Sequence, residues 1–204
     1  MQSQRPQSAL ACRWYPDQEP DSEVGWAHVS GWAQLDNGRR RSLSCVVPVR
    51  NALPSLRGLL PALSDTLTEC GYPWEIIVVD RCSDDGTEEA IAPWCQLPGY
   101  RLLIALDESV DRSAAIALGL GAARGDAAVL IDANCRQTTV LHEMVARWDD
   151  GNPVVLATLG ATAADTAVLA PTSLSDALGI ADGHAADTER LLLMDRTVLD
   201  ELLR

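Results

Sequence analysis

Polar residues that could do chemistry follow the short apolar runs of this sequence, at the points where strands would end. They are the pairs Arg50-Asn51 and Asp80-Arg81 and, further along the chain, the stretches 109–112 and 132–136. Ligands of open parallel sheets bind beyond the carboxyl ends of the strands. We therefore expect the strand-end aspartates Asp80 and Asp132 and four arginines to meet at one edge of a sheet, and this edge is the expected binding site.

Several common kinds of reaction centre have no counterpart in the sequence. There is no glycine-rich dinucleotide loop and no Walker-type phosphate loop. A Ser/His/Asp triad would lack its nucleophile elbow, and the three histidines are too scattered for a metal cluster. The six cysteines lie far apart without a Cys-x-x-Cys pair, so neither a disulfide framework nor a zinc site is expected.

The elements that must position the polar residues alternate between strand and helix. Apolar, β-branched runs predict strands at 43–49, 75–80, 101–106, 127–131 and 154–158. Helices are expected from a leucine stripe over 56–67, after the capping residues Thr87 and Asp111, and at 140–148 and 197–203. This alternation predicts right-handed βαβ units on a mostly parallel sheet, which is the α/β class.

The charge of the chain limits its partners. The 204 residues contain 16 Lys+Arg and 29 Asp+Glu, a net charge of −13, which argues against general binding to nucleic acid or to anionic membranes. No apolar run approaches the roughly 18–20 residues that cross a bilayer. The polar first eight residues do not resemble a secretory signal. We therefore expect no nucleic-acid partner, no transmembrane segment and a cytoplasmic location.

The first part of the chain, residues 1–41, differs from the rest in composition. Its stretch 17–23 is acidic and proline-punctuated, which is typical of a flexible segment, yet Trp14, Trp26 and Trp32 also lie here. One interpretation is a small hairpin packed on the domain, and the other is an aromatic strip that docks a protein partner. We expect an N-terminal extension over 1–41 and one folded domain over 42–204.

Four ordered motifs resemble a known family. The stretches 46–51 (VVPVRN), 75–87 (EIIVVDRCSDDGT), 122–126 (AARGD) and 131–134 (IDAN) are similar to successive landmarks of family-2 glycosyltransferases. Within that family the dolichyl- and undecaprenyl-phosphate sugar transferases are the most similar. The resemblance covers about 43–160 and resumes near 187–204. It implies a GT-A fold, a Rossmann-like sheet flanked by helices, and a nucleotide-diphosphate sugar as ligand.

The resemblance also implies roles for individual residues. Asp132 and Asn134 stand where the family places the Asp-x-Asp that holds Mg²⁺ or Mn²⁺ on the diphosphate, and Asp132 is the candidate catalytic residue. The residues implied in nucleotide-sugar binding are Pro48, Asn51, Asp80, Ser83, Asp85 and Asp132.

The polar positions of these motifs depart from the family pattern. An amide at 134 replaces a metal carboxylate and arginine at 81 replaces a neighbouring acid, changes that weaken a divalent-cation site. Leu192 falls where the family has an arginine facing the phosphate, and the segment 161–186 is short for an acceptor region. The candidate anion-binding residues are Arg50, Arg81, Arg112, Arg136 and Arg190. These arginines either hold an anion directly in place of the metal or pair with neighbouring aspartates such as Asp84, Asp85, Asp107 and Asp111.

The expected function is therefore that of a glycosyltransferase family 2-like domain with weak or lost metal-dependent transfer. If the domain is active, it belongs to the hexosyltransferases. Two alternatives stay open: a catalytically inactive interaction or regulatory module, and a metal-independent, arginine-lined nucleotide- or anion-binding protein. Mg²⁺ or Mn²⁺ remains the candidate cofactor.

Overall fold

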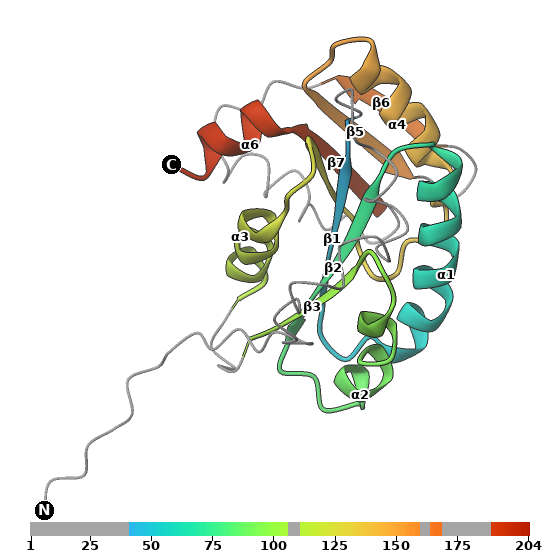
Figure 1. The fold of residues 1–204 in the computed structure, drawn as a ribbon, viewed down its shortest axis with the longest axis vertical. Helices are drawn as coiled ribbons and strands as arrows, with labels where there is room; N and C mark the ends of the chain where they lie inside the picture. The colour runs from blue at the N-terminus through green and yellow to red at the C-terminus, as the bar shows by residue number, and fades with distance from the viewer. Residues whose placement is uncertain (1–40, 106–110, 160–163, 169–188) are drawn as a thin grey trace, which may run out of the picture.

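The computed structural model describes residues 41–105, 111–159, 164–168 and 189–204 (Figure 1). The strands are β1 (Leu43–Val49), β2 (Trp74–Arg81), β3 (Tyr100–Ala105), β4 (Ala127–Leu130), β5 (Val154–Leu159), β6 (Ala164–Val168) and β7 (Glu189–Asp195). The helices are α1 (Leu53–Glu69), α2 (Thr87–Ile91), the 3-10 helix η2 (Trp94–Gln96), α3 (Arg112–Ala122), α4 (Val140–Asp149) and α6 (Arg196–Leu202). The predicted strands and helices are thus present, with ends shifted by one to three residues.

All seven strands form one sheet, in the order β3-β2-β1-β4-β7-β5-β6. The first four are parallel, as expected from the alternation of strands and helices. Near the end of the chain, β7 inserts antiparallel between β4 and β5. The α/β class is confirmed, and β7 makes the sheet mixed rather than wholly parallel.

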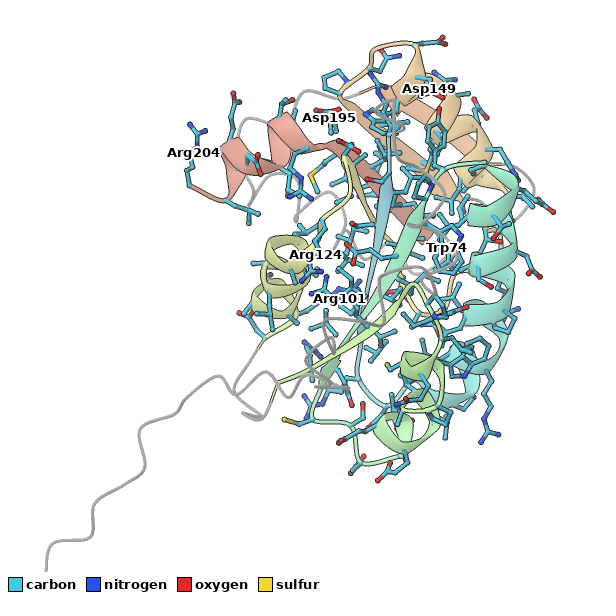
Figure 2. The ribbon with its side chains drawn as sticks, in the orientation of Figure 1. Trp74, Arg101, Arg124, Asp149, Asp195 and Arg204 are labelled. Carbon is cyan, nitrogen blue, oxygen red and sulfur yellow. The ribbon has the colours of Figure 1, made fainter. Side chains whose placement is uncertain are left out.

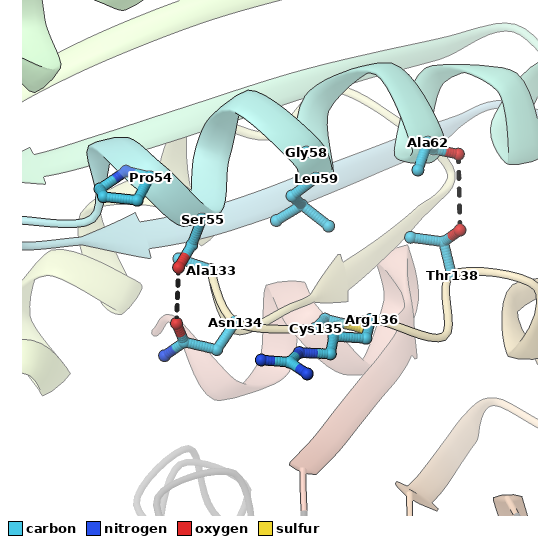
Figure 3. Close-up of a pocket in the computed structure, with 10 residues that line it drawn as sticks. All are labelled: Pro54, Ser55, Gly58, Leu59, Ala62, Ala133, Asn134, Cys135, Arg136 and Thr138. Atoms are coloured by element: carbon cyan, nitrogen blue, oxygen red, sulfur yellow. Dashed lines mark hydrogen bonds between the residues drawn. The ribbon is translucent and has the colours of Figure 1, made fainter.

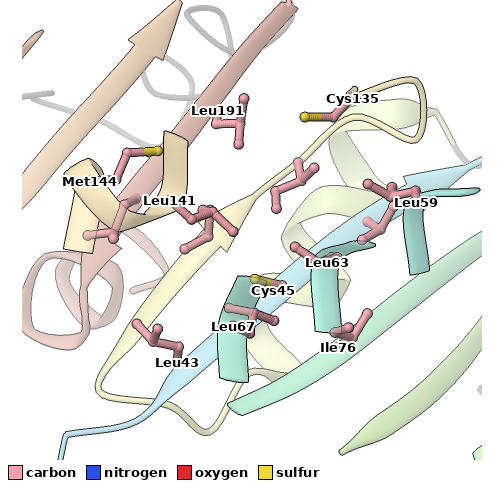
Figure 4. Close-up of a cluster of buried hydrophobic side chains, with 14 of the residues drawn as sticks. Leu43, Cys45, Leu59, Leu63, Leu67, Ile76, Cys135, Leu141, Met144 and Leu191 are labelled. Atoms are coloured by element: carbon pink, nitrogen blue, oxygen red, sulfur yellow. The ribbon is translucent and has the colours of Figure 1, made fainter. Parts of the chain in front are cut away.

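Helices cover both faces of the sheet. On one face, α1 and α4 pack over Leu43, Cys45 and their neighbours, and the whole leucine stripe of α1 is buried there (Figure 4). On the other face, α3 and α6 cover a second cluster that includes Val46, Leu192 and Met194 (Figure 1). Burial on both faces explains why the strand sequences are continuously apolar instead of alternating.

Thr87 and Asp111 are the predicted N-cap residues of α2 and α3. Asp111 caps α3 as predicted, since its side chain accepts a hydrogen bond from the backbone N–H of Ala114 at 2.7 Å. The prediction that Thr87 caps α2 is wrong. The cap position belongs to Gly86, whose φ of 82° is a left-handed conformation that glycine adopts without a steric penalty, and Thr87 is the first helical residue.

A network of buried polar groups closes the amino edge of the sheet, where the parallel strands begin. Glu75, 4% exposed, accepts hydrogen bonds from the Ser44 hydroxyl at 2.7 Å and from the backbone N–H of Arg124 at 2.7 Å. It also forms an ion pair of 2.9 Å with Arg101, whose guanidinium in turn donates to the Ala122 carbonyl. Figure 2 labels Arg101 and Arg124, which lie near α3. This network ties β1, β2, β3 and the end of α3 together.

The motif 122–126 belongs to the same edge. A Cβ at Gly125 would lie 2.7 Å from the backbone nitrogen of Ser44, so only glycine fits between the incoming chain and β1. Asp126 accepts hydrogen bonds from the backbone N–H and the hydroxyl of Ser42 at 2.9 and 2.8 Å. The Arg196 guanidinium donates to the carbonyls of Ala123 and Gly125. This family landmark is therefore structural and lies away from the carboxyl edge.

Trp148 anchors the end of α4 at the amino edge. Its ring is 1% exposed and its indole N–H donates to the Asp195 carboxylate at 2.8 Å. Arg41 lies over the ring at 4.7 Å from the centroid. This packing fixes the point at which the chain enters the described domain.

Several expectations fall outside the described residues. They are nearly all of the extension 1–41 with its tryptophans, Ser109 and Val110, and most of the segment 161–186. In the described part of the chain, no helix is both long enough and apolar enough to cross a membrane.

Candidate functional site

The carboxyl edge of the sheet gathers the residues singled out in the sequence. In the parallel register Val49 lies beside Asp80 and Val46 beside Leu130, so β1, β2 and β4 end at the same edge. The loops that leave these strands carry Asn51, Ser83 and Asp132. Pro48 differs, because it is buried inside β1 opposite Val79 and one residue short of the edge.

Asp80, Ser83 and Asn51 form one hydrogen-bonded group. The Asp80 carboxylate accepts from the Ser83 hydroxyl and, at 3.2 Å, from the Ser83 backbone N–H. The Ser83 hydroxyl accepts from the Asn51 backbone N–H at 2.8 Å, and the Asn51 side chain accepts from the backbone N–H of Asp84 at 2.9 Å. Asn51 and Cys82 have φ of 52° and 53°, uncommon values for residues with a side chain. The loops after β1 and β2 are thus held in strained conformations, which often occur at functional sites.

Burial sets the protonation of Asp80. Its side chain is 1% exposed, and this desolvation raises the pKa above the usual aspartate range, although the hydrogen bonds from Ser83 act in the opposite direction. A carboxyl group placed at a strand end, buried and still hydrogen-bonded can bind donors of a ligand that enters the edge.

Asp85 has a role that the motif did not reveal. One carboxylate oxygen accepts from the backbone N–H of Leu53 at 3.0 Å, and the other accepts from the N–H and hydroxyl of Thr87. Asp85 therefore serves the first turn of α1, which has no capping side chain of its own, and it also joins α1 to α2. The Thr87 and Leu53 hydrogen bonds lower the pKa of Asp85.

Asp132 lies at the centre of a second group, in which both carboxylate oxygens are engaged. One oxygen forms an ion pair of 3.0 Å with Arg112 at the start of α3. The other accepts from the backbone N–H and the side-chain amide of Asn134 at 2.9 and 3.1 Å. The side chains of Arg112 and Asp132 are 31% and 32% exposed, so the pair stays open to solvent.

Asn134 uses its amide oxygen elsewhere. That oxygen accepts from the hydroxyl of Ser55 in α1 at 2.8 Å. The expected ligand pair Asp132 and Asn134 is therefore bound to a guanidinium and a hydroxyl. In the described residues, no three His, Cys, Asp or Glu side chains are grouped as a metal site would require. Mg²⁺ is usually held by one or two carboxylates together with phosphate oxygens and water. The pair Asp132 and Asn134 fits such an ion poorly, because its one carboxylate is paired with the Arg112 guanidinium and its amide oxygen already accepts from Ser55.

Arg190 reaches the same edge from the end of the chain. Because β7 is antiparallel to β4 with Leu130 opposite Leu192, the start of β7 lies where β4 ends. Leu192 is fully buried, and Arg190, two residues earlier, is on the same face of β7 as Leu192. α3, which carries Arg112, packs on this side of the sheet, so Arg190 and Arg112 are on the same side of the sheet at its carboxyl edge.

The interpretation that the arginines pair with Asp84, Asp85, Asp107 or Asp111 can be followed for three of these aspartates, because Asp107 lies outside the described residues. Arg112 pairs with Asp132, Asp111 caps α3, and Asp85 binds backbone N–H groups. Arg50 and Arg81 form no ion pair with any residue in the described ranges. Arg136 is exposed and lies on the α1 side of the 132–138 loop. Arg50 and Arg81 therefore remain candidates for binding an anion at this edge.

Comparison with known proteins places this geometry in context. The family described as Glycosyl transferase family 2 matches residues 44–191. An uncharacterised glycosyltransferase of Synechocystis is 30% identical over 117 residues, which are 57% of this chain and 37% of that protein. The undecaprenyl-phosphate 4-deoxy-4-formamido-L-arabinose transferase of Aeromonas hydrophila is 30% identical over 101 residues, 49% of this chain and 31% of that one.

A solved structure shows the same fold at low sequence identity. The mannosyltransferase of Pyrobaculum calidifontis in complex with GDP-Man and Mn²⁺ aligns with a TM-score of 0.50 and 22% identity, covering 80% of this chain and 47% of that one. This likeness supports the GT-A fold. The chain spans about a third of the length of the curated relatives it matches.

Proposed function

The chain belongs to glycosyl transferase family 2, and from this membership we propose that its carboxyl edge binds a nucleotide-diphosphate sugar while metal-dependent transfer is weak or lost. The observation that carries the proposal is the 3.0 Å ion pair between Arg112 and Asp132. A guanidinium holds the carboxylate that a divalent cation would need.

The group around Asp80 supports the nucleoside half of the proposal. Asp80, Ser83 and Asn51 already share hydrogen bonds at the ends of neighbouring strands. A ligand base or ribose can bind to such a group without reorganising it, because strand ends and strained turns hold the side chains in place.

The group around Asp132 supports the loss of metal dependence. Binding of Mn²⁺ would require the cation to displace Arg112 or to bind beside its positive charge, at a cost of a few kcal/mol for close like charges at an effective protein dielectric. Asn134 offers only a neutral oxygen, which already accepts from Ser55. Both features lower the affinity for a divalent ion.

Arg112 and Arg190 lie on the same side of the sheet, and this arrangement favours a second candidate function. Guanidinium groups bind phosphate through paired, charge-assisted hydrogen bonds. In this candidate, arginines in place of a metal hold the diphosphate, so that the domain binds nucleotides without divalent ions. A role as an interaction or regulatory module remains a further alternative, which depends on the extension 1–41.

Calorimetry on the full chain tests these proposals with GDP-mannose and UDP-glucose, each in Mn²⁺ and in EDTA. We expect saturable binding that changes by less than about twofold between the two conditions, and no release of nucleotide with undecaprenyl phosphate as acceptor. Binding that appears only with Mn²⁺, accompanied by turnover, contradicts the proposal.

Asp132→Asn distinguishes the candidates by the sign of its effect. If Arg112 and its neighbours hold the diphosphate, removing the carboxylate releases Arg112 and tightens binding in EDTA by about threefold to tenfold. If Asp132 holds a metal, the same variant abolishes Mn²⁺-dependent binding. Arg57→Gln, at an exposed position of α1 outside the edge, is the matched control and leaves binding unchanged.

A further inference from the structure

A separate pocket lies between α1 and the loop 133–138, on the face of the sheet opposite α3 (Figure 3). Its volume of about 490 Å³ is within the usual size of small-molecule sites. The described residues that line it do not include Asp80, Asp132 or Arg112. The pocket therefore adjoins the candidate nucleotide-sugar site and shares Asn134 and Arg136 with its candidate residues, whereas the groups around Asp80 and Arg112 lie outside it.

Hydrogen bonds hold the pocket at both ends. At one end the Ser55 hydroxyl donates to the Asn134 amide oxygen at 2.8 Å. At the other end Thr138 bonds to Thr66 at 2.8 Å and to the Ala62 carbonyl at 3.4 Å, so that the loop is fixed to α1 (Figure 3). These two points are seven residues apart on the helix, roughly 10 Å along its axis. The gap between them is thus preformed, and a ligand would not have to open it.

Gly58 keeps the middle of this gap empty. Glycine inside a helix is unfavourable by roughly 0.5–1 kcal/mol relative to alanine. A Cβ at Gly58 would nevertheless meet no atom within 4 Å, so packing against the rest of the chain does not require glycine. The missing side chain leaves open space above Leu59, which is 3% exposed and forms part of the apolar wall.

The charge and polarity of the lining residues indicate which kind of ligand the pocket would bind. Arg136 is the one cation among the described lining residues, and no carboxylate is among them. In a chain with a net charge of −13, a pocket without acidic groups is one of the places where an anion meets little repulsion. Leu59, Pro54 and Ala62 offer an apolar surface beside the guanidinium, and the Ser55 and Asn134 groups are polar.

We propose that this pocket binds a small organic anion, in which a carboxylate or phosphate group contacts Arg136 and an apolar body lies along α1 at Gly58. The guanidinium binds the anion by charge-assisted hydrogen bonds. The apolar body covers Leu59 and fills the space that Gly58 leaves. The proposal rests on the lining of the pocket and does not require that a nucleotide binds at the carboxyl edge.

Amide NMR on the full chain tests the proposal with four probes: phenyl phosphate, phenylacetate, phenol and inorganic phosphate. We expect phenyl phosphate or phenylacetate to shift the amides of 55–62 and 133–138 saturably, and phenol and inorganic phosphate to bind at least about tenfold more weakly. Preference for phenyl phosphate or for phenylacetate identifies the anionic group. Absence of saturable shifts with both, or equal binding of phenol or inorganic phosphate, overturns the proposal.

Two variants with matched controls locate the ligand. Gly58→Leu fills the pocket with a better helix former and should abolish binding, whereas Gly121→Leu, at an exposed glycine of α3 with equally open space, should leave it unchanged. Arg136→Gln should weaken binding about tenfold or more, and Arg57→Gln should not. Full binding by Gly58→Leu or by Arg136→Gln, each checked for a native spectrum, contradicts the assignment.

Discussion

The two edges of the sheet both contain arginines and carboxylates, but they use them differently. At the amino edge Glu75 and Arg101 are 5% and 16% exposed at their side chains, and their partners include backbone N–H and carbonyl groups. At the carboxyl edge Arg112 and Asp132 are about twice as exposed as Arg101, at 31% and 32%. The same residue types thus form a buried scaffold at one edge and an open, polar group at the other.

This difference in exposure separates charged residues that stabilise the fold from charged residues that can bind a ligand. A buried carboxylate that binds groups of three segments, as Glu75 binds the Ser44 hydroxyl, the Arg101 guanidinium and the Arg124 backbone N–H, holds a fold together, because each segment would lose a hydrogen bond without it. A half-exposed ion pair contributes little to stability and can exchange its partner for a ligand. Family resemblance covers both edges, whereas the proposed nucleotide-sugar site lies at the carboxyl edge.

The largest predicted effect comes from breaking the amino-edge network. Glu75→Ala leaves the Arg101 charge buried without its carboxylate and should lower the free energy of unfolding by about 3–5 kcal/mol, as measured by urea denaturation. Glu143→Ala removes an exposed ion pair with Arg147 and serves as the control, with an expected change below about 0.5 kcal/mol. If both variants lose a similar free energy of unfolding, buried and exposed ion pairs do not differ in their contribution to stability.

A pair of glycines tests the close approach at the same edge. Gly125→Ala places a Cβ against the backbone of Ser44 and Leu43 and should lower the free energy of unfolding by about 1–3 kcal/mol. Gly121→Ala, where a Cβ meets open space in α3, should instead raise it by about 0.5–1 kcal/mol. Thermal unfolding of the two variants reports both signs, and a stabilised Gly125→Ala would be inconsistent with the steric explanation.

Asp195 makes the amino edge sensitive to acid. Burial raises its pKa, but hydrogen bonds from Trp148 and Thr197 outweigh this effect and lower the pKa below the usual value. The ionised form is therefore stabilising above the usual aspartate pKa, and the contribution is lost as the pH falls through the lowered pKa. Asp195→Ala should cost about 1–2 kcal/mol near pH 7, because α6 also loses its N-cap.

The pH dependence of the loss of stability in Asp195→Ala tests this prediction. The difference in unfolding free energy between wild type and Asp195→Ala should narrow between pH 7 and a strongly acidic pH, because the wild-type carboxylate is protonated as the pH falls through its lowered pKa. Urea titrations at both pH values, followed by circular dichroism, measure the two differences. A constant difference would mean that the charge of Asp195 does not matter.

The smallest predicted effect on stability is at the carboxyl edge. Arg112→Gln removes an ion pair that is about a third exposed, so the free energy of unfolding should change by less than about 1 kcal/mol. Nucleotide binding in EDTA should nevertheless weaken, since a phosphate-binding guanidinium is lost. A loss of stability comparable to that of Glu75→Ala would show that the Arg112–Asp132 pair at the carboxyl edge stabilises the fold, as the Glu75–Arg101 pair does at the amino edge.

Much of the fold could be predicted because its signals are local. The leucine stripe of α1, the β-branched runs of β1 and β2 and the cap at Asp111 depend on residues a few positions apart. Thr87 was misassigned as a cap because threonine is a common N-cap residue, and the left-handed φ of Gly86 is a property of the loop conformation. The motif 122–126 directly precedes the predicted strand 127–131, so its place at the amino edge follows from the order along the chain, whereas its contacts with Ser42 and Arg196 do not.

The site could be predicted as a set of residues but not as a set of contacts. Asp132 and Arg112 were both candidates, yet their pairing depends on where α3 begins relative to the end of β4. Asp85 serves α1 from 32 residues away, and Ser55 reaches Asn134 across 79 residues. Local sequence patterns do not indicate which residues so far apart in the chain will be in contact.

Periodicity and residue type alone determined that this chain alternates strands and helices and that its polar residues follow the strands, because burial on both faces of a parallel sheet demands continuous apolar runs. Only the tertiary structure decided that a guanidinium holds Asp132, that β7 brings Arg190 to the same edge, and that a pocket remains between α1 and the loop 133–138. These features depend on strand order and register, which bring together residues far apart in the chain.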